Sequence, residues 1–97
     1  MAVTEQYIIG ELSVLLVGLE AVAPDEESAC EFARLRVETE TAAFERLPKM
    51  ALEALRLIRG LCRDSLARGD LRALTSQATL AAELREFAVS AGLLADG

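Results

Sequence analysis

The chain of 97 residues is long enough for one small domain, and its composition limits what that domain can do. Hydrophobic residues make up 53% of it and aromatic residues only 4%, so we expect an aliphatic core. The formal net charge of −6 leaves little positive charge to neutralise phosphates. Nucleic acid is therefore not an expected partner.

The sequence lacks the residues on which most small catalytic centres depend. Histidine is absent, which excludes His-based acid–base chemistry and His-containing metal sites. The glycines are isolated and form no phosphate-binding loop. Cys30 and Cys62 are expected to be buried free thiols, with a disulfide between them as the less favoured alternative. No cofactor and no metal are expected, and a non-enzymatic role is favoured.

Several features favour a cytoplasmic protein with no membrane partner. The most apolar run, LSVLLVGL at residues 12–19, is far shorter than the roughly 20 residues that span a bilayer. The first basic residue is Arg34, so the beginning of the sequence lacks the positive charge of a secretory signal. The same lack of Lys and Arg disfavours anchoring of the first helix on anionic lipid. Nine arginines against one lysine, with abundant alanine, indicate a GC-rich bacterial genome.

Helix formers dominate, and no segment shows the alternation typical of a strand. The sequence predicts an all-α fold, an antiparallel up-and-down four-helix bundle in one domain over residues 1–97. Its helices are expected near residues 4–22, 25–47, 49–68 and 70–91. Acidic residues directly after Pro24 mark the start of the second helix. Leu47 precedes Pro48 and is expected to leave the α region, which separates the second helix from the third.

The tripeptide Arg68-Gly69-Asp70 has two interpretations, an adhesion signal or a joint between helices. Gly69 after a basic residue is typical of a left-handed helix end, and Asp70 is a favourable N-cap. We therefore predict a helix–helix joint. Gly92 is expected to end the last helix, with Leu93 and Leu94 folding back onto it.

Polar residues form a stripe along the helix predicted over residues 70–91. They recur at spacings of three and four, which places them on one face of a helix. The stripe consists of Arg72, Ser76, Thr79, Glu83, Glu86 and Ser90. The other side of this helix is expected to face the core.

The helix predicted over residues 4–22 is apolar nearly all round, which indicates that more than one surface covers it. Gly10 and Gly18 would allow a second backbone to approach closely on one side. We predict that this helix contacts a second copy of the chain, forming a dimer, or the amphipathic helix of a protein partner. The candidate interface residues are Ile8, Ile9, Leu12, Leu15, Leu16, Val17 and Leu19. Alternatively, the helix lies centrally and the other three helices of its own chain cover it.

The third helix carries Arg56, Arg59 and Arg63 at spacings of three and four. These arginines suit a small anion-binding enzyme or sensor if Glu38, Glu45 or Glu86 lies opposite them. A solvated outer face balanced by neighbouring acids explains the same pattern. An anion-binding role is therefore the second function hypothesis, after an interaction module.

Overall fold

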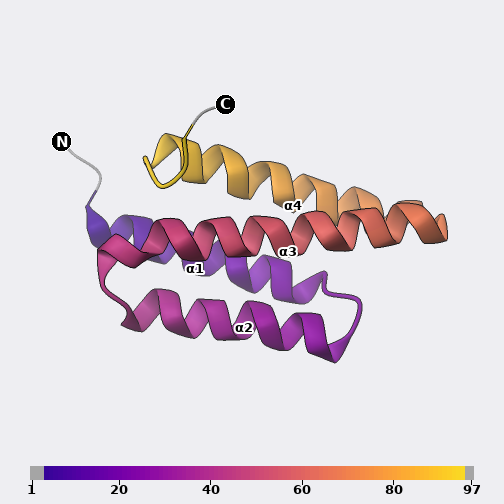
Figure 1. Ribbon diagram of the computed structural model, residues 1–97, viewed down its shortest axis with the longest axis horizontal. Helices are drawn as coiled ribbons and strands as arrows, with labels where there is room; N and C mark the ends of the chain where they lie inside the picture. Colours follow the sequence, from indigo (N-terminus) through magenta and orange to yellow (C-terminus); the bar gives the residue numbers. More distant parts are fainter. Residues whose placement is uncertain (1–3, 96–97) are drawn as a thin grey trace.

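The computed structural model describes residues 4–95 and consists of helices joined by short connections (Figure 1). The four α-helices are α1 (Glu5–Ala21), α2 (Glu26–Thr41), α3 (Leu47–Arg68) and α4 (Leu71–Ser90), and a 3₁₀ turn, η1 (Phe44–Arg46), precedes α3. Consecutive helices run in opposite directions (Figure 1), and the described residues contain no strand. The predicted all-α four-helix bundle is confirmed.

The bundle is flattened, with Cα extents of 44 × 27 × 17 Å. Helices α1 and α3 lie between α2 on one side and α4 on the other (Figure 1). The most extensive packing is within the hairpins α1/α2 and α3/α4, and α1 also contacts α3 and α4. Because α3 and α4 are the longer helices, their hairpin projects past the α1/α2 hairpin (Figure 1).

Aliphatic side chains from all four helices form one core. Among residues 4–95, Phe32 is the only aromatic side chain that is fully buried, which agrees with the low aromatic content. The buried apolar residues are Ile8, Leu12, Leu16, Leu19, Phe32, Leu35, Leu47, Met50, Ala51, Ala54, Leu55, Ile58, Leu84, Ala88 and Leu93. The polar stripe of α4 lies outside this core, because all six of its residues are exposed.

Three helices begin at side-chain caps that the sequence supplies. The Thr4 hydroxyl accepts a hydrogen bond from the Tyr7 backbone N–H at 3.1 Å, and Asp25 Oδ1 accepts from Ser28 N–H at 2.7 Å. Each cap satisfies a backbone donor that has no partner within its helix. The hydrogen bonds from Ser28 lower the pKa of the Asp25 carboxyl below its usual value of 3.8.

The Arg68-Gly69-Asp70 segment is the joint between α3 and α4. Gly69 has φ = 72°, a left-handed conformation that costs glycine little. The Asp70 backbone N–H donates to the Ser65 carbonyl at 2.9 Å, and Asp70 Oδ1 accepts from Ala73 N–H at 3.1 Å. The prediction of a helix end followed directly by a helix start is confirmed.

The end of α4 also follows the prediction. Gly92 has φ = 77°, and the Leu93 backbone N–H donates to the Ala88 carbonyl at 2.8 Å. This hydrogen bond turns the chain back, so that Leu93 is buried and Leu94 packs against the core. The fold-back of the two leucines over the end of α4 is confirmed.

The second helix ends at Thr41, six residues before the predicted position. Ala42 and Ala43 are extended, with ψ angles of 163° and 145°. The hydroxyl of Thr39 donates to the Leu35 carbonyl and that of Thr41 to the Val37 carbonyl. Such bonds weaken a helix, and β-branched threonines have low helix propensity. The prediction of a helix through residue 47 is wrong at this end.

The third helix begins at Leu47, and Pro48 lies in its first turn. Leu47 has φ = −59° and ψ = −38°, so the expectation that it leaves the α region is wrong. Its side chain is completely buried, and this burial offsets the steric cost of an α conformation before proline. The turn η1 between the two helices places Phe44 against the core.

Two buried polar side chains connect α3 and α4. Ser65 Oγ donates to Gln77 Oε1 at 2.7 Å, and both residues are essentially inaccessible to solvent. The same Ser65 oxygen accepts from Arg68 at 3.3 Å. Gln77 Nε2 donates to the Val22 carbonyl at 3.5 Å, which links this pair to the end of α1. Gln77 therefore joins the two hairpins.

We expect Ser65→Ala to lower the free energy of unfolding by about 1–3 kcal/mol, because it leaves the buried Gln77 oxygen without a donor. Urea denaturation measures the change. The control is Ser76→Ala, since Ser76 is exposed and bonds only within its own helix. Adding Gln77→Met to Ser65→Ala removes both partners and should restore part of the loss. If the loss of unfolding free energy in the double variant equals the sum of the losses in the two single variants, the Ser65–Gln77 hydrogen bond is not the cause of the instability.

Candidate functional site

The structure buries most of the predicted α1 interface inside its own chain. Ile8, Leu12, Leu16 and Leu19 belong to the core, and Ile9 and Leu15 are half-buried against it. Of the seven candidates only Val17 is exposed, at 51% of its surface. The alternative in which the other helices of the chain cover this side of α1 therefore accounts for six of the seven residues.

A different set of α1 residues faces solvent. These residues are spaced by three and four, which places them on the side of the helix opposite the buried leucines. We call this set the α1 outer strip; it consists of Tyr7, Gly10, Val14, Val17 and Ala21. All five are exposed and none is charged, and Val14 is the most open at 66%.

The two glycines of α1 face different surroundings. A Cβ added to Gly18 would lie 3.4 Å from Leu80 Cδ2, so this glycine packs against α4. A Cβ added to Gly10 would meet no atom within 4 Å. The expectation that both glycines serve one side is therefore wrong, and only Gly10 is open to a second backbone.

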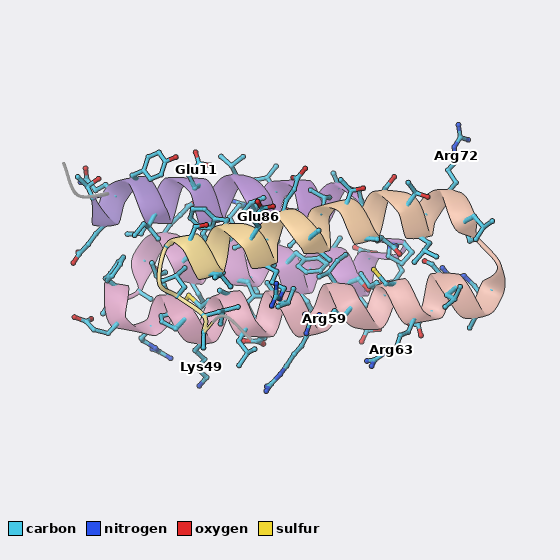
Figure 2. The ribbon with its side chains drawn as sticks, turned by 90° about the horizontal axis from the view of Figure 1, so that it is seen from above. Glu11, Lys49, Arg59, Arg63, Arg72 and Glu86 are labelled. Carbon is cyan, nitrogen blue, oxygen red and sulfur yellow. The ribbon has the colours of Figure 1, made fainter. Side chains whose placement is uncertain are left out.

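The predicted arginine strip does not form a single site. Arg56, Arg59 and Arg63 are all exposed, and none of them forms an ion pair within residues 4–95. Glu38 is held by Arg34 at 2.9 Å, and Glu86 projects from the opposite side of the molecule (Figure 2). Within the part of the chain that the structure describes, no carboxylate, Glu45 included, lies within 4.0 Å of a nitrogen of these arginines.

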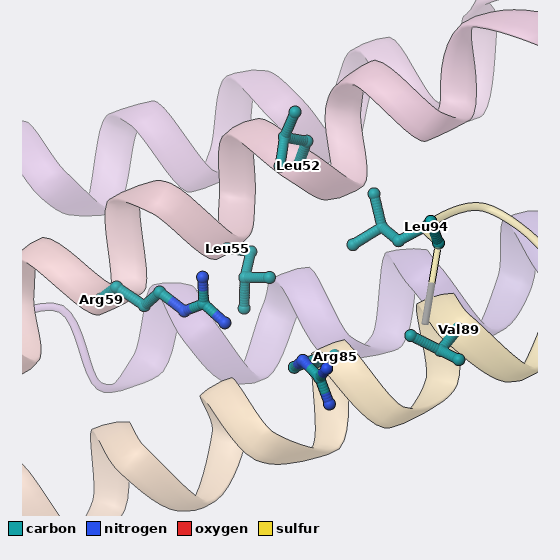
Figure 3. A pocket seen from close by; sticks show the side chains of 7 residues that line it. Leu52, Leu55, Arg59, Arg85, Val89 and Leu94 are labelled. Carbon is teal, nitrogen blue, oxygen red and sulfur yellow. The ribbon is translucent and has the colours of Figure 1, made fainter. Parts of the chain in front are cut away.

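Arg59 instead faces Arg85 of α4 across a surface cavity of about 310 Å³ (Figure 3). The cavity lies between α3 and α4 and is closed at one end by the segment after α4. Its lining consists of Leu52, Leu55, Arg59, Arg85, Val89, Leu94 and Ala95. Arg85 was not a candidate from the sequence, because its proximity to Arg59 depends on how α4 packs against α3. A cavity of this size is large enough for a small organic molecule.

Arg34 forms three of the five ion pairs recorded among residues 4–95. It lies 2.7 Å from Glu53 of α3, 2.9 Å from Glu38 and 3.2 Å from Glu31. The hydrogen bond to Glu53 raises the pKa of Arg34 above its usual value the most, and those to Glu31 and Glu38 add to this effect. These carboxylates already have a cation, so the cluster connects α2 to α3 and offers no open ligand site.

Within the described residues, the two cysteines do not form a disulfide. Cys30 is exposed and Cys62 is half-buried. The expectation that both are buried is therefore wrong for Cys30, and burial raises the pKa of Cys62. Across residues 4–95, no three metal-ligating side chains gather into a cluster. None of the helices described has the length and apolar character needed to cross a membrane.

Comparison of the chain with known protein families, with curated proteins and with solved structures finds no match. The geometry of the α1 outer strip and of the arginine cavity is therefore the basis for a functional proposal.

Arg34→Gln should lower the free energy of unfolding by roughly 1 kcal/mol at low salt, the upper part of the range for exposed ion pairs. The loss combines three broken contacts with repulsion among the glutamates left behind. In about 1 M NaCl the difference should shrink, because salt screens these exposed charges. Chemical denaturation of both proteins at the two salt concentrations measures it. The matched control, Arg56→Gln, should change little, and a loss independent of salt would contradict the role given to these charges.

Proposed function

We propose that this protein is a non-enzymatic interaction module that forms a homodimer through the α1 outer strip. One observation carries the proposal: α1 presents an exposed, uncharged face directly opposite the face that its own bundle buries. A solvated face of a helix normally carries charged or polar side chains. The proposed dimer supplies the second cover for α1, and the cytoplasm of a bacterium is its expected location.

The strip complements itself when two copies of α1 pack antiparallel. In a two-fold arrangement centred on Val14, the large Tyr7 lies opposite the small Ala21 of the partner subunit. In the same arrangement, Gly10 lies within about 1.5 Å, along the helix axis, of the level of Val17 of the partner subunit. Tyr7 and Val17 therefore each lie beside a small residue, and Val14 meets its own copy at the two-fold axis.

The charges beside the strip are compatible with this pairing. Glu20 lies on the α2 side of the helix, 3.9 Å from Arg36. Glu11 lies on the α4 side, seven residues before Gly18. In the antiparallel arrangement the two copies of Glu11 are roughly 9 Å apart along the helix axis, and those of Glu20 are farther apart. At physiological salt, charges separated by that distance repel weakly.

The strip is narrow, so we expect a reversible dimer rather than an obligate one. A standard interface buries about 800 Å² on each partner, which is more than one helix face provides. Neighbouring side chains of α2 and α4 must supply the remainder. A dissociation constant in the micromolar range or weaker is therefore expected.

Val14→Arg should weaken the dimer at least about tenfold, because it places two arginines against each other at the two-fold axis. Sedimentation velocity over a concentration series up to roughly 100 μM measures the constant. Thermal unfolding should change little, because Val14 contacts solvent in the monomer.

Leu66→Arg is the control for this variant. Leu66 is a similarly exposed aliphatic residue, at 61%, in the last turn of α3 and outside the strip, and the substitution adds the same charge. It should leave the dimer intact. If the unmodified protein sediments as a monomer throughout the series, the dimer proposal fails. If Leu66→Arg alone dissociates the dimer, the hairpin tip is the interface instead.

Gly10→Leu should change monomer stability and dimerisation in opposite directions. The new side chain enters open solvent, so the monomer should gain about 0.5–1 kcal/mol from higher helix propensity. The same side chain should weaken the dimer, because it prevents close approach to Val17 of the partner subunit. Denaturation at low protein concentration measures the first effect and sedimentation the second. A stabilised variant with unchanged association would remove Gly10 from the interface.

A further inference from the structure

The cavity between α3 and α4 has a charged part and an apolar part. Arg59 extends from α3 along Leu55 toward α4, where Arg85 lies on the other side of the opening (Figure 3). Leu52, Leu55, Val89 and Leu94 supply the apolar lining. The guanidinium groups of two helices therefore lie beside the apolar lining of one surface cavity.

Neither of these arginines is neutralised within residues 4–95. The ion pairs of that range are made by Arg34 and Arg36. Other exposed basic residues also lack an acidic partner, and what distinguishes Arg59 and Arg85 is that both line the same cavity. Two like charges at one cavity repel each other, and a bound anion removes that repulsion.

We propose that this cavity binds a small carboxylate that carries an apolar chain. A guanidinium matches a carboxylate with two parallel hydrogen bonds, and two guanidiniums surround it from both helices. The chain of the ligand packs on the four aliphatic side chains. The volume of about 310 Å³ is at the lower end of the range for ligand pockets, which limits the ligand to a short or medium chain.

The two parts of the cavity discriminate among anions. Inorganic phosphate gains the arginines but leaves the apolar lining exposed to water. A neutral alcohol of the same chain length gains the lining but leaves the arginines without a partner. Only a molecule with both groups uses the whole cavity.

Titration of isotope-labelled protein with octanoate, followed by NMR, tests the proposal. We expect saturable binding with a dissociation constant of about 0.1–1 mM, and shifts confined to residues around the cavity. Arg59→Gln and Arg85→Gln should each weaken binding about tenfold, the cost of one charge-assisted contact. Octanol and acetate should each bind much more weakly than octanoate.

Arg56→Gln and Arg63→Gln are matched controls, because they remove the same charge from α3 but lie outside the cavity. They should leave octanoate binding within about twofold. An equal loss in these controls would overturn the site, since it would indicate general attraction to the basic face of α3. Octanol binding as tightly as octanoate would also overturn it.

Asp96 directly follows Ala95, a residue of the cavity lining, in the sequence, so a variant without its carboxylate is a further control. The titration is therefore repeated with Asp96→Asn. Binding that is equal or tighter in this variant, and still dependent on Arg59, supports the proposal. Absence of saturable binding in both proteins overturns it. The Val14→Arg variant should bind octanoate normally, so failure of the dimer and failure of this site are distinguishable.

Discussion

The burial of α1 is the constraint on which the rest of this structure depends. In a flattened bundle, α1 contacts all three other helices and still covers only one side of itself with its own chain. Leu12, Leu16 and Leu19 fill that side completely. The opposite side remains apolar, although nothing in the monomer requires it to be. An apolar residue facing water gains no burial energy, and the proposed dimer would supply that burial for the row of exposed residues.

Helices α2 and α3 carry opposite net charges. Helix α2 carries five acidic and two basic residues, and both bases form ion pairs with neighbouring acids. Helix α3 carries five basic and two acidic residues, and only Glu53 contributes to the inter-helix ion pairs described. The basic residues of α2 are thus paired with acidic residues, whereas those of α3 form no ion pair within residues 4–95. The arginine cavity is the place where this surplus coincides with a hollow.

Features that depend on neighbours in the sequence, such as helix caps, predicted the fold well. The candidate sites depend on contacts between helices, which the sequence alone does not specify. Gly69 and Asp70 specify their joint through φ preference and capping, which depend on neighbours in sequence. The end of α2 was missed because Phe44 and Leu47 also fit the apolar side of a continued helix. Arg85 was missed because its neighbour Arg59 belongs to another helix, and the α3–α4 packing register is not visible in either helix alone. For α1, apolar residues all round left the direction of the buried side undetermined.

The two proposed sites lie on different sides of the bundle. The α1 outer strip faces away from the core, whereas Arg59 projects from α3 on the far side of the molecule (Figure 2). Two copies joined through α1 therefore leave both cavities open to solvent on the outside of the dimer. Two sites are coupled when a part of the protein can adopt two conformations and binding at each site changes the equilibrium between them. The helices between these sites are packed through one continuous core, so dimer formation and ligand binding are expected to be independent equilibria.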